Sequence, residues 1–197
     1  ICEGAKEDKS GWSAFLRHLV DRGLTGVRLI ISDACRGLME SAAEYLPEAR
    51  WQRCMVHFYR NVFSHVPTTK VREVSHMLKA IHAQESRDAA DKKARAIVDD
   101  LRASKMNTAA DLVEQSVHET LTYYAFPDIH WQKIRTNNPL ERMMKEIRRR
   151  TRVVGAFPDG QSCLNLAAAR LRYIAGTAWS AKCYMNMRPL YQPQLMQ

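Results

Sequence analysis

The sequence lacks several features that would assign it to familiar classes of protein. It has no apolar run of about 20 residues, which a membrane-spanning helix needs, and its first residues contain no signal-peptide core. We therefore expect a cytoplasmic protein with no membrane partner. The five cysteines are scattered and odd in number, which predicts free thiols rather than a disulfide framework. A glycine-rich phosphate loop and a Ser-His-Asp pattern are also missing.

Positive charge is what the sequence has in excess. Its 197 residues carry 30 Lys or Arg against 21 Asp or Glu, giving a formal net charge of +9. Between residues 133 and 152, eight Lys or Arg stand against two Glu, so this short segment contributes +6. Many basic proteins bind no polyanion, but a concentration of this kind favours a nucleic acid as the partner.

Hydrophobic periodicity indicates an α/β fold. Helical spacing is expected over 10–24, 37–46, 71–83, 86–104, 108–124, 138–153 and 159–175, and short apolar runs predict strands over 26–33 and 50–57. The order helix, strand, helix, strand, helix at the start is typical of a parallel sheet covered by helices.

Composition also predicts how the chain is divided. We expect an α/β core over 1–66, an all-helical insertion over 67–130, a return to the core over 131–186 and a poorly ordered tail over 187–197. The first residue is Ile rather than Met, and we interpret the chain as a fragment whose upstream part is missing.

Asp33 is the first candidate for chemistry. It ends a predicted buried strand, and ligand sites in open α/β sheets form at the carboxyl ends of the strands. A carboxylate there could reach a metal ion. The alternative is that Asp33 caps the following helix, and position alone does not separate the two.

Glu141 is the second candidate, near the start of the basic helix. The sequence Asn138-Pro-Leu-Glu141 fits a capping box, in which the glutamate would only bond back to the helix start. Yet Leu140, Met144 and Ile147 form a stripe that we expect to be buried, and Glu141 and Arg148 lie together along its border. Such a border position faces a cleft readily. Glu146 projects elsewhere and is expected to pair with nearby arginines.

The same helix carries a row of cations at three- and four-residue spacing, formed by Arg142, Lys145, Arg149 and Arg152. Such a ridge could track a phosphate backbone, although an ordinary solvated basic face has the same pattern. Cys54 and His57 have metal-ligand spacing, but no second Cys/His pair is close, so a structural zinc site is a weak hypothesis.

Four segments taken together resemble a known family. They are residues 26–38 (GVRLIISDACRGL), 51–61 (WQRCMVHFYRN), 136–142 (TNNPLER) and 148–158 (RRRTRVVGAFP). In this order they are similar to the Mutator-type transposases of bacterial insertion sequences. The resemblance implies a ribonuclease-H-like sheet, partial here because its N-terminal strands are missing, with a helical insertion and C-terminal helices.

The resemblance also implies roles for particular residues. Asp33 matches the second aspartate of an Asp-Asp-Glu triad, and Glu141, 108 residues later, matches its glutamate. The triad would hold two Mg²⁺ or Mn²⁺ ions. The positions implied to contact DNA are Arg142, Lys145, Arg148, Arg149, Arg150 and Arg152. Cys54 and His57 match a Cys-x-x-His motif whose role the sequence does not reveal.

One departure from the family pattern leaves three functional hypotheses open. The first catalytic aspartate would lie upstream of this sequence. The intact protein is expected to cut and join DNA at element ends and target, as a homo-oligomer. The alternatives are a truncated, inactive remnant that binds only DNA or a partner protein, and a nuclease that only hydrolyses.

Overall fold

The computed structural model describes residues 7–191, and its centre is a sheet of two parallel strands. Strand β1 (Leu29–Ser32) and strand β2 (Arg50–Arg53) are joined by helix α2 (Arg36–Tyr45). Leu29 is opposite Arg50 and Ser32 is opposite Arg53, so both strands end at the same edge. A parallel pair needs such a crossover, and here the crossover is the helix.

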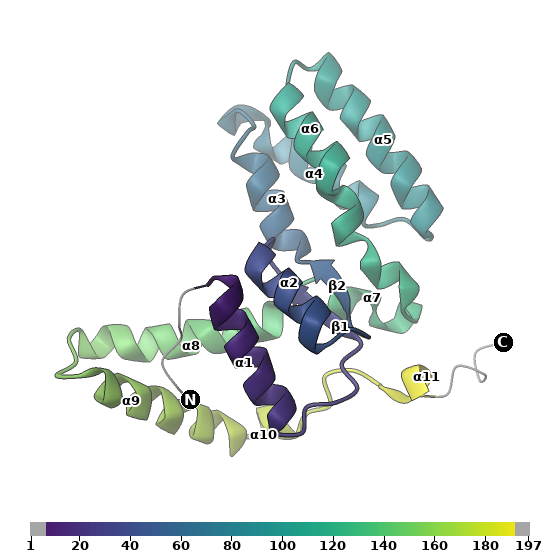
Figure 1. Cartoon of the computed structure of the whole chain (residues 1–197). Helices are drawn as coiled ribbons and strands as arrows, with labels where there is room; N and C mark the ends of the chain where they lie inside the picture. The colour runs from purple at the N-terminus through teal and green to yellow at the C-terminus, as the bar shows by residue number, and fades with distance from the viewer. Residues whose placement is uncertain (1–6, 192–197) are drawn as a thin grey trace.

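Helix α1 (Lys9–Asp21) packs against α2, as Figure 1 shows. The two helices share a small core of Leu16, Leu38 and Ala42. The contact requires glycine at Gly37, because a Cβ atom there would lie 2.7 Å from the main-chain nitrogen of Lys9. A larger residue would push the helices apart.

A block of helices forms the main hydrophobic core, and its helices α3 to α6 are at the top of Figure 1. It comprises α3 (Met55–Phe63), η1 (Thr68–Lys70), α4 (Val71–Ile81), α5 (Arg87–Ala103), α6 (Asn107–Ser116), η2 (Val117–Thr120), η3 (Thr122–Ala125) and α7 (Asp128–Ile134). Its largest buried side chains include Phe58, Leu78, Ile97, Leu101 and Tyr123. Most of the chain's buried apolar surface is therefore in helices.

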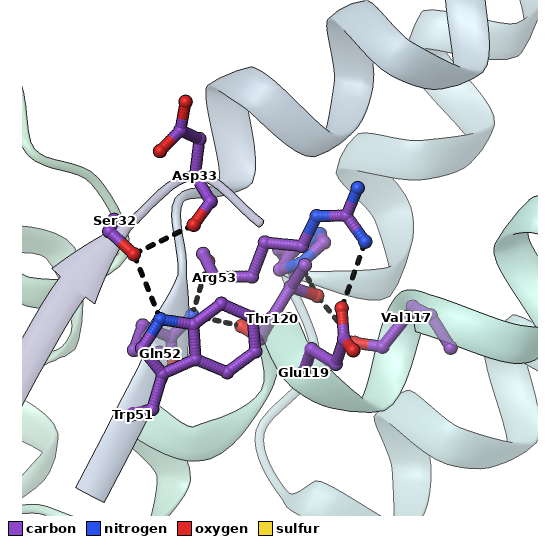
Figure 2. A network of polar contacts seen from close by, with 9 residues as sticks. Ser32, Asp33, Trp51, Gln52, Arg53, Val117, Glu119 and Thr120 are labelled. Carbon is purple, nitrogen blue, oxygen red and sulfur yellow. Dashed lines mark hydrogen bonds and ion pairs between the residues drawn. The ribbon is translucent and has the colours of Figure 1, made fainter. Parts of the chain in front are cut away.

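A buried polar network attaches this block to the sheet (Figure 2). The Gln52 amide donates to the carbonyl of Thr120 at 2.6 Å and accepts from the Tyr123 amide at 2.9 Å. Nearby, the Arg53 guanidinium forms an ion pair with Glu119 at 2.8 Å. Polar groups removed from water must find partners, so strand β2 specifies where the helical block docks.

Most of the basic segment lies in the first helix of a hairpin that projects from the rest of the molecule (Figure 1). Helix α8 (Asn138–Val154) ends at Gly155, whose φ of +78° suits glycine, and α9 (Gly160–Ala175) returns beside it. Short helices α10 (Ala178–Ala181) and α11 (Arg188–Tyr191) follow. Neither α8 nor α9 contains a fully buried residue, so the hairpin is held largely by contacts at its surface.

The mixed α/β class and the parallel pairing expected from the sequence are confirmed, and the molecule is mostly helical. Some expectations were wrong in detail. The strand expected over 50–57 ends at Arg53, because Cys54 caps helix α3, which begins at Met55. The helix expected over 108–124 is interrupted after Ser116 by two short 3₁₀ turns.

Residues 131–186 contain helices and no strand, so the sheet of the described residues has two strands. Two strands do not identify a ribonuclease-H-like sheet, and that fold and the domain boundaries stay predictions. Of the expected tail, residues 188–191 form α11, and residues 192–197 lie outside the described range. None of the helices within 7–191 combines the length and apolar character that a membrane crossing needs.

Candidate functional site

Asp33 follows the last residue of β1 and is exposed. Its main chain is held in place: the Ser32 hydroxyl donates to the Asp33 carbonyl at 2.7 Å, and the Trp51 indole donates to that hydroxyl at 2.9 Å. Figure 2 shows the Asp33 carboxylate pointing away from this network. The cap of α2 is Cys35, without a side-chain hydrogen bond, so the capping alternative for Asp33 does not occur.

Glu141 lies in the first turns of α8 and pairs with a histidine. Its Oε1 atom is 3.5 Å from Nε2 of His57, with the two side chains 36% and 27% exposed. The capping box is not formed, because the helix cap is Asn137 and its side chain does not bond to the helix start. The carboxylate of Glu141 instead faces a neighbouring helix.

The Cys-x-x-His motif joins the starts of two helices. Cys54 caps α3 and is fully buried, and its thiol donates to Oδ1 of Asn137 at 3.2 Å. His57, one turn further along α3, reaches Glu141. Cys54 therefore contacts the cap of α8 and His57 the turn that follows. Across the described residues no three His, Cys, Asp or Glu side chains are grouped to hold a metal.

The sheet edge and the start of α8 meet through Cys54. Its main-chain N–H donates to the carbonyl of Ser32 at 2.6 Å, directly before Asp33. The following N–H, of Met55, donates to the carbonyl of Arg135, shortly before α8. The structure thus brings Asp33 and the segment carrying Glu141 to the same edge of the sheet, although they are 108 residues apart in the sequence.

An open cleft of about 660 Å³ lies between the first turns of α3 and α8. Glu141 is its carboxylate, and His57 and Asn137 line it beside the apolar side chains of Leu140 and Met144. Its four cationic residues are Arg60, Arg142, Lys145 and Arg148. Positive groups therefore surround the carboxylate on an exposed surface that is suited to an anion.

Two details differ from what the sequence predicted. Leu140 and Met144, expected in a buried stripe, are 56% and 39% exposed, because no other described element covers that face of α8. Arg60 lines the cleft and was not singled out. The sequence does contain a signal for Arg60, since it follows His57 by three residues and so shares a face of the same helix.

The basic row divides between two faces of α8. Arg142, Lys145 and Arg148 line the cleft with Glu141. Arg149 and Arg150 instead pair with Glu146, at 2.9 and 3.6 Å, and Arg170 of α9 joins the same carboxylate. The hydrogen bond from Arg149 is the main reason that the pKa of Glu146 is lowered to about 2. Arg152 is exposed near the end of the helix and lies away from the cleft.

Comparison with known proteins identifies relatives over nearly the whole chain. Residues 2–179 match the family described as "Transposase, Mutator family". The transposase for insertion sequence element ISRM5 of Rhizobium meliloti (strain 1021) is 36% identical over 187 residues, which cover 94% of this chain and 46% of that protein.

Two further relatives have similar names. The transposase for IS1081 of Mycobacterium tuberculosis is 39% identical, covering 84% of this chain and 40% of its own length. The transposase for IS406 of Burkholderia multivorans is 36% identical, covering 95% and 49%. The chain thus spans about half the length of the curated relatives it matches.

Proposed function

Because this chain belongs to the Mutator family of transposases, we propose that it contains part of the catalytic centre and DNA-contacting surface of an enzyme that cleaves an insertion sequence from DNA and joins it to a target. The observation that carries the proposal is the cleft between α3 and α8. There Glu141 lies among four cationic side chains. Asp33 does not line the cleft itself; it follows the end of β1, which is hydrogen-bonded to Cys54 at the start of α3.

The cations account for DNA binding. Arg142, Lys145 and Arg148 follow one another along α8, and Arg60 lies across the cleft on α3. Lys and Arg side chains hold phosphates by charge and hydrogen bonds, and binding of this type weakens as the salt concentration rises. We assign these residues to holding the scissile strand against the sheet edge. The reaction is an in-line displacement, in which a hydroxyl oxygen bonds to phosphorus as the bond to the leaving oxygen breaks.

A divalent cation is part of the proposal. Asp33 and Glu141 fit its donor chemistry, since carboxylate oxygens are the ligands that Mg²⁺ and Mn²⁺ prefer. Two such ions, when bound, supply positive charge against the oxygens around phosphorus. Because residues 7–191 contain no group of three metal-ligating side chains, we assign these two carboxylates only part of the ligand set.

In one alternative, the chain binds DNA or a partner protein without cutting. A nuclease that only hydrolyses is a second alternative, and it shares the cleft and the carboxylates. An assay that separates joined from merely cut DNA distinguishes it from a transposase. Homo-oligomers acting on paired element ends stay a prediction.

Arg148 offers a direct test. In the full-length protein, we expect Arg148→Ala to reduce strand cleavage and joining by about a hundredfold, the scale of a lost transition-state contact, while DNA affinity falls only several-fold. Cleavage and joining are measured on labelled element ends, and affinity by filter binding. Arg152→Ala is the matched control, because it removes the same charge from the same helix outside the cleft. Equal losses of activity and affinity in Arg148→Ala would count against the assignment.

A further inference from the structure

A second groove lies between α8 and the helices α9 and α10. Its volume is about 360 Å³. Arg142 and Lys145, which line the cleft with Glu141, also line this groove, so the two hollows meet at these side chains. An extended strand held in the cleft can continue over α8 into the groove.

The groove presents aromatic rings to solvent. Trp179 of α10 is 42% exposed and Tyr173 of α9 is 63% exposed, and both line it together with Met143 and Ile174. The guanidinium of Arg170 lies 4.6 Å from the centre of the Tyr173 ring and occupies one of its faces. Trp179 is therefore the main flat apolar surface available to a ligand.

The charge around these rings favours an anionic ligand. Four cationic side chains line the groove against a single carboxylate, that of Glu146. Among the described residues Glu146 pairs with Arg149, Arg150 and Arg170, which leaves Arg142 and Lys145 for an external partner. An apolar protein surface covering this groove would have to remove those two charges from water without a counterion, which is unfavourable.

We propose that the groove between α8, α9 and α10 binds an unpaired nucleotide of DNA, with its base stacked on Trp179 and flanked by Tyr173, and its phosphate held by Arg142 and Lys145. Aromatic rings beside a cationic surface are the usual means of holding single strands, because every base offers a flat π-face. A base inside a duplex has both faces covered by its neighbours. The groove therefore selects for unpaired DNA, and this inference rests on the proposed DNA-processing function.

The test compares two fluorescently labelled DNAs by anisotropy, a blunt duplex and the same duplex with a short unpaired 3′ tail. We expect Trp179→Ala to weaken binding of the tailed DNA by about tenfold, the effect of losing one stacked base, and to leave blunt-duplex affinity unchanged. Trp179→Phe keeps an aromatic face and should restore most of the preference. Phe15→Ala, which removes an aromatic ring of similar exposure from α1, is the matched control.

The other possible outcomes contradict either the base-binding groove or the proposed function on which it rests. If Trp179→Ala weakens the binding of both DNAs equally, or of neither, the proposal of a base-binding groove is wrong. If Trp179→Ala changes the oligomeric state in sedimentation velocity without changing the preference for the tail, the groove is a protein interface instead. If the wild-type chain binds neither DNA, the proposed function itself fails, whereas salt-sensitive binding of both without preference contradicts the groove alone.

Discussion

At the scale of single residues, His82 is a titratable group in the core. It is 2% exposed, and its ring nitrogens contact the Tyr59 hydroxyl and the Thr120 hydroxyl, each at 2.8 Å. Burial disfavours the charged imidazolium and lowers the pKa of His82 to about 4. In the unfolded chain the same group titrates near its ordinary pKa of about 6.5.

This difference predicts acid sensitivity with a definite sign. The unfolded state binds the proton first as the pH falls, so the stabilisation is complete above the unfolded pKa and is lost as the pH falls from about 6.5 towards 4. Between about pH 7 and about pH 5 the loss from this group is about 2 kcal/mol. Urea unfolding at both pH values should show a smaller decrease for His82→Gln than for the wild type. His118→Gln, at an exposed position, should behave like the wild type, and equal decreases in all three proteins would refute the prediction.

The sequence indicated some residues of the candidate site and missed others. Asp33 and Glu141 could be selected because an acid at a strand end and an acid in a basic helix are visible in the sequence. The pairing of Glu141 with His57 could not, since it depends on where α3 and α8 meet. Arg60 was missed because a lone arginine on a helix is common and only its neighbours make it part of a cleft.

At the scale of elements, the joint between α3 and α8 sets the position of Glu141. Cys54 contacts Asn137, and His57 contacts Glu141, so two successive turns of each helix are linked. No buried apolar side chain of α8 helps to hold it there. These contacts are therefore expected to govern how firmly the start of α8 is held.

Cys54 itself reports on this joint. Its thiol is buried, whereas Cys183 is exposed, so iodoacetamide should modify Cys54 slowly in the native chain. Removing one contact, by Asn137→Ala or His57→Ala, should speed its modification about fivefold, the change expected for roughly 1 kcal/mol of local opening. Peptide mass spectrometry gives the rate at each cysteine separately. His65→Ala, an exposed histidine of the turn after α3, is the control, and unchanged Cys54 rates in both test variants would contradict the proposed joint.

At the scale of the whole molecule, Gln52 connects the sheet to the helical block. Its fully buried amide bonds to residues about 70 positions further along the chain, at Thr120 and Tyr123. A leucine of similar volume could fill the space but could not pair these main-chain groups. The buried Tyr123 N–H and Thr120 carbonyl would then be left without their partner.

We expect Gln52→Leu to lower the free energy of unfolding by about 2–4 kcal/mol, since each unpaired buried polar group costs roughly 1–3 kcal/mol. Equilibrium urea denaturation measures the change. Gln132→Leu makes the same replacement at an exposed position and should alter stability little. A loss below about 1 kcal/mol for Gln52→Leu would show that the helical block docks without this network.

The sequence by itself determined the elements and the chemistry carried on them. Helical and strand periodicity, the acid at the end of β1 and the dense charge of α8 are local properties, because each depends on residues close together in the chain. Only the tertiary structure decided which residues meet. The joint of Cys54 and His57 with α8 and the cleft shared with Arg60 arise from helices that are far apart in sequence, and the groove beside Trp179 forms where α9 and α10 fold back beside α8. Their positions follow from the packing of the core and the pairing of buried polar groups, which no local pattern specifies.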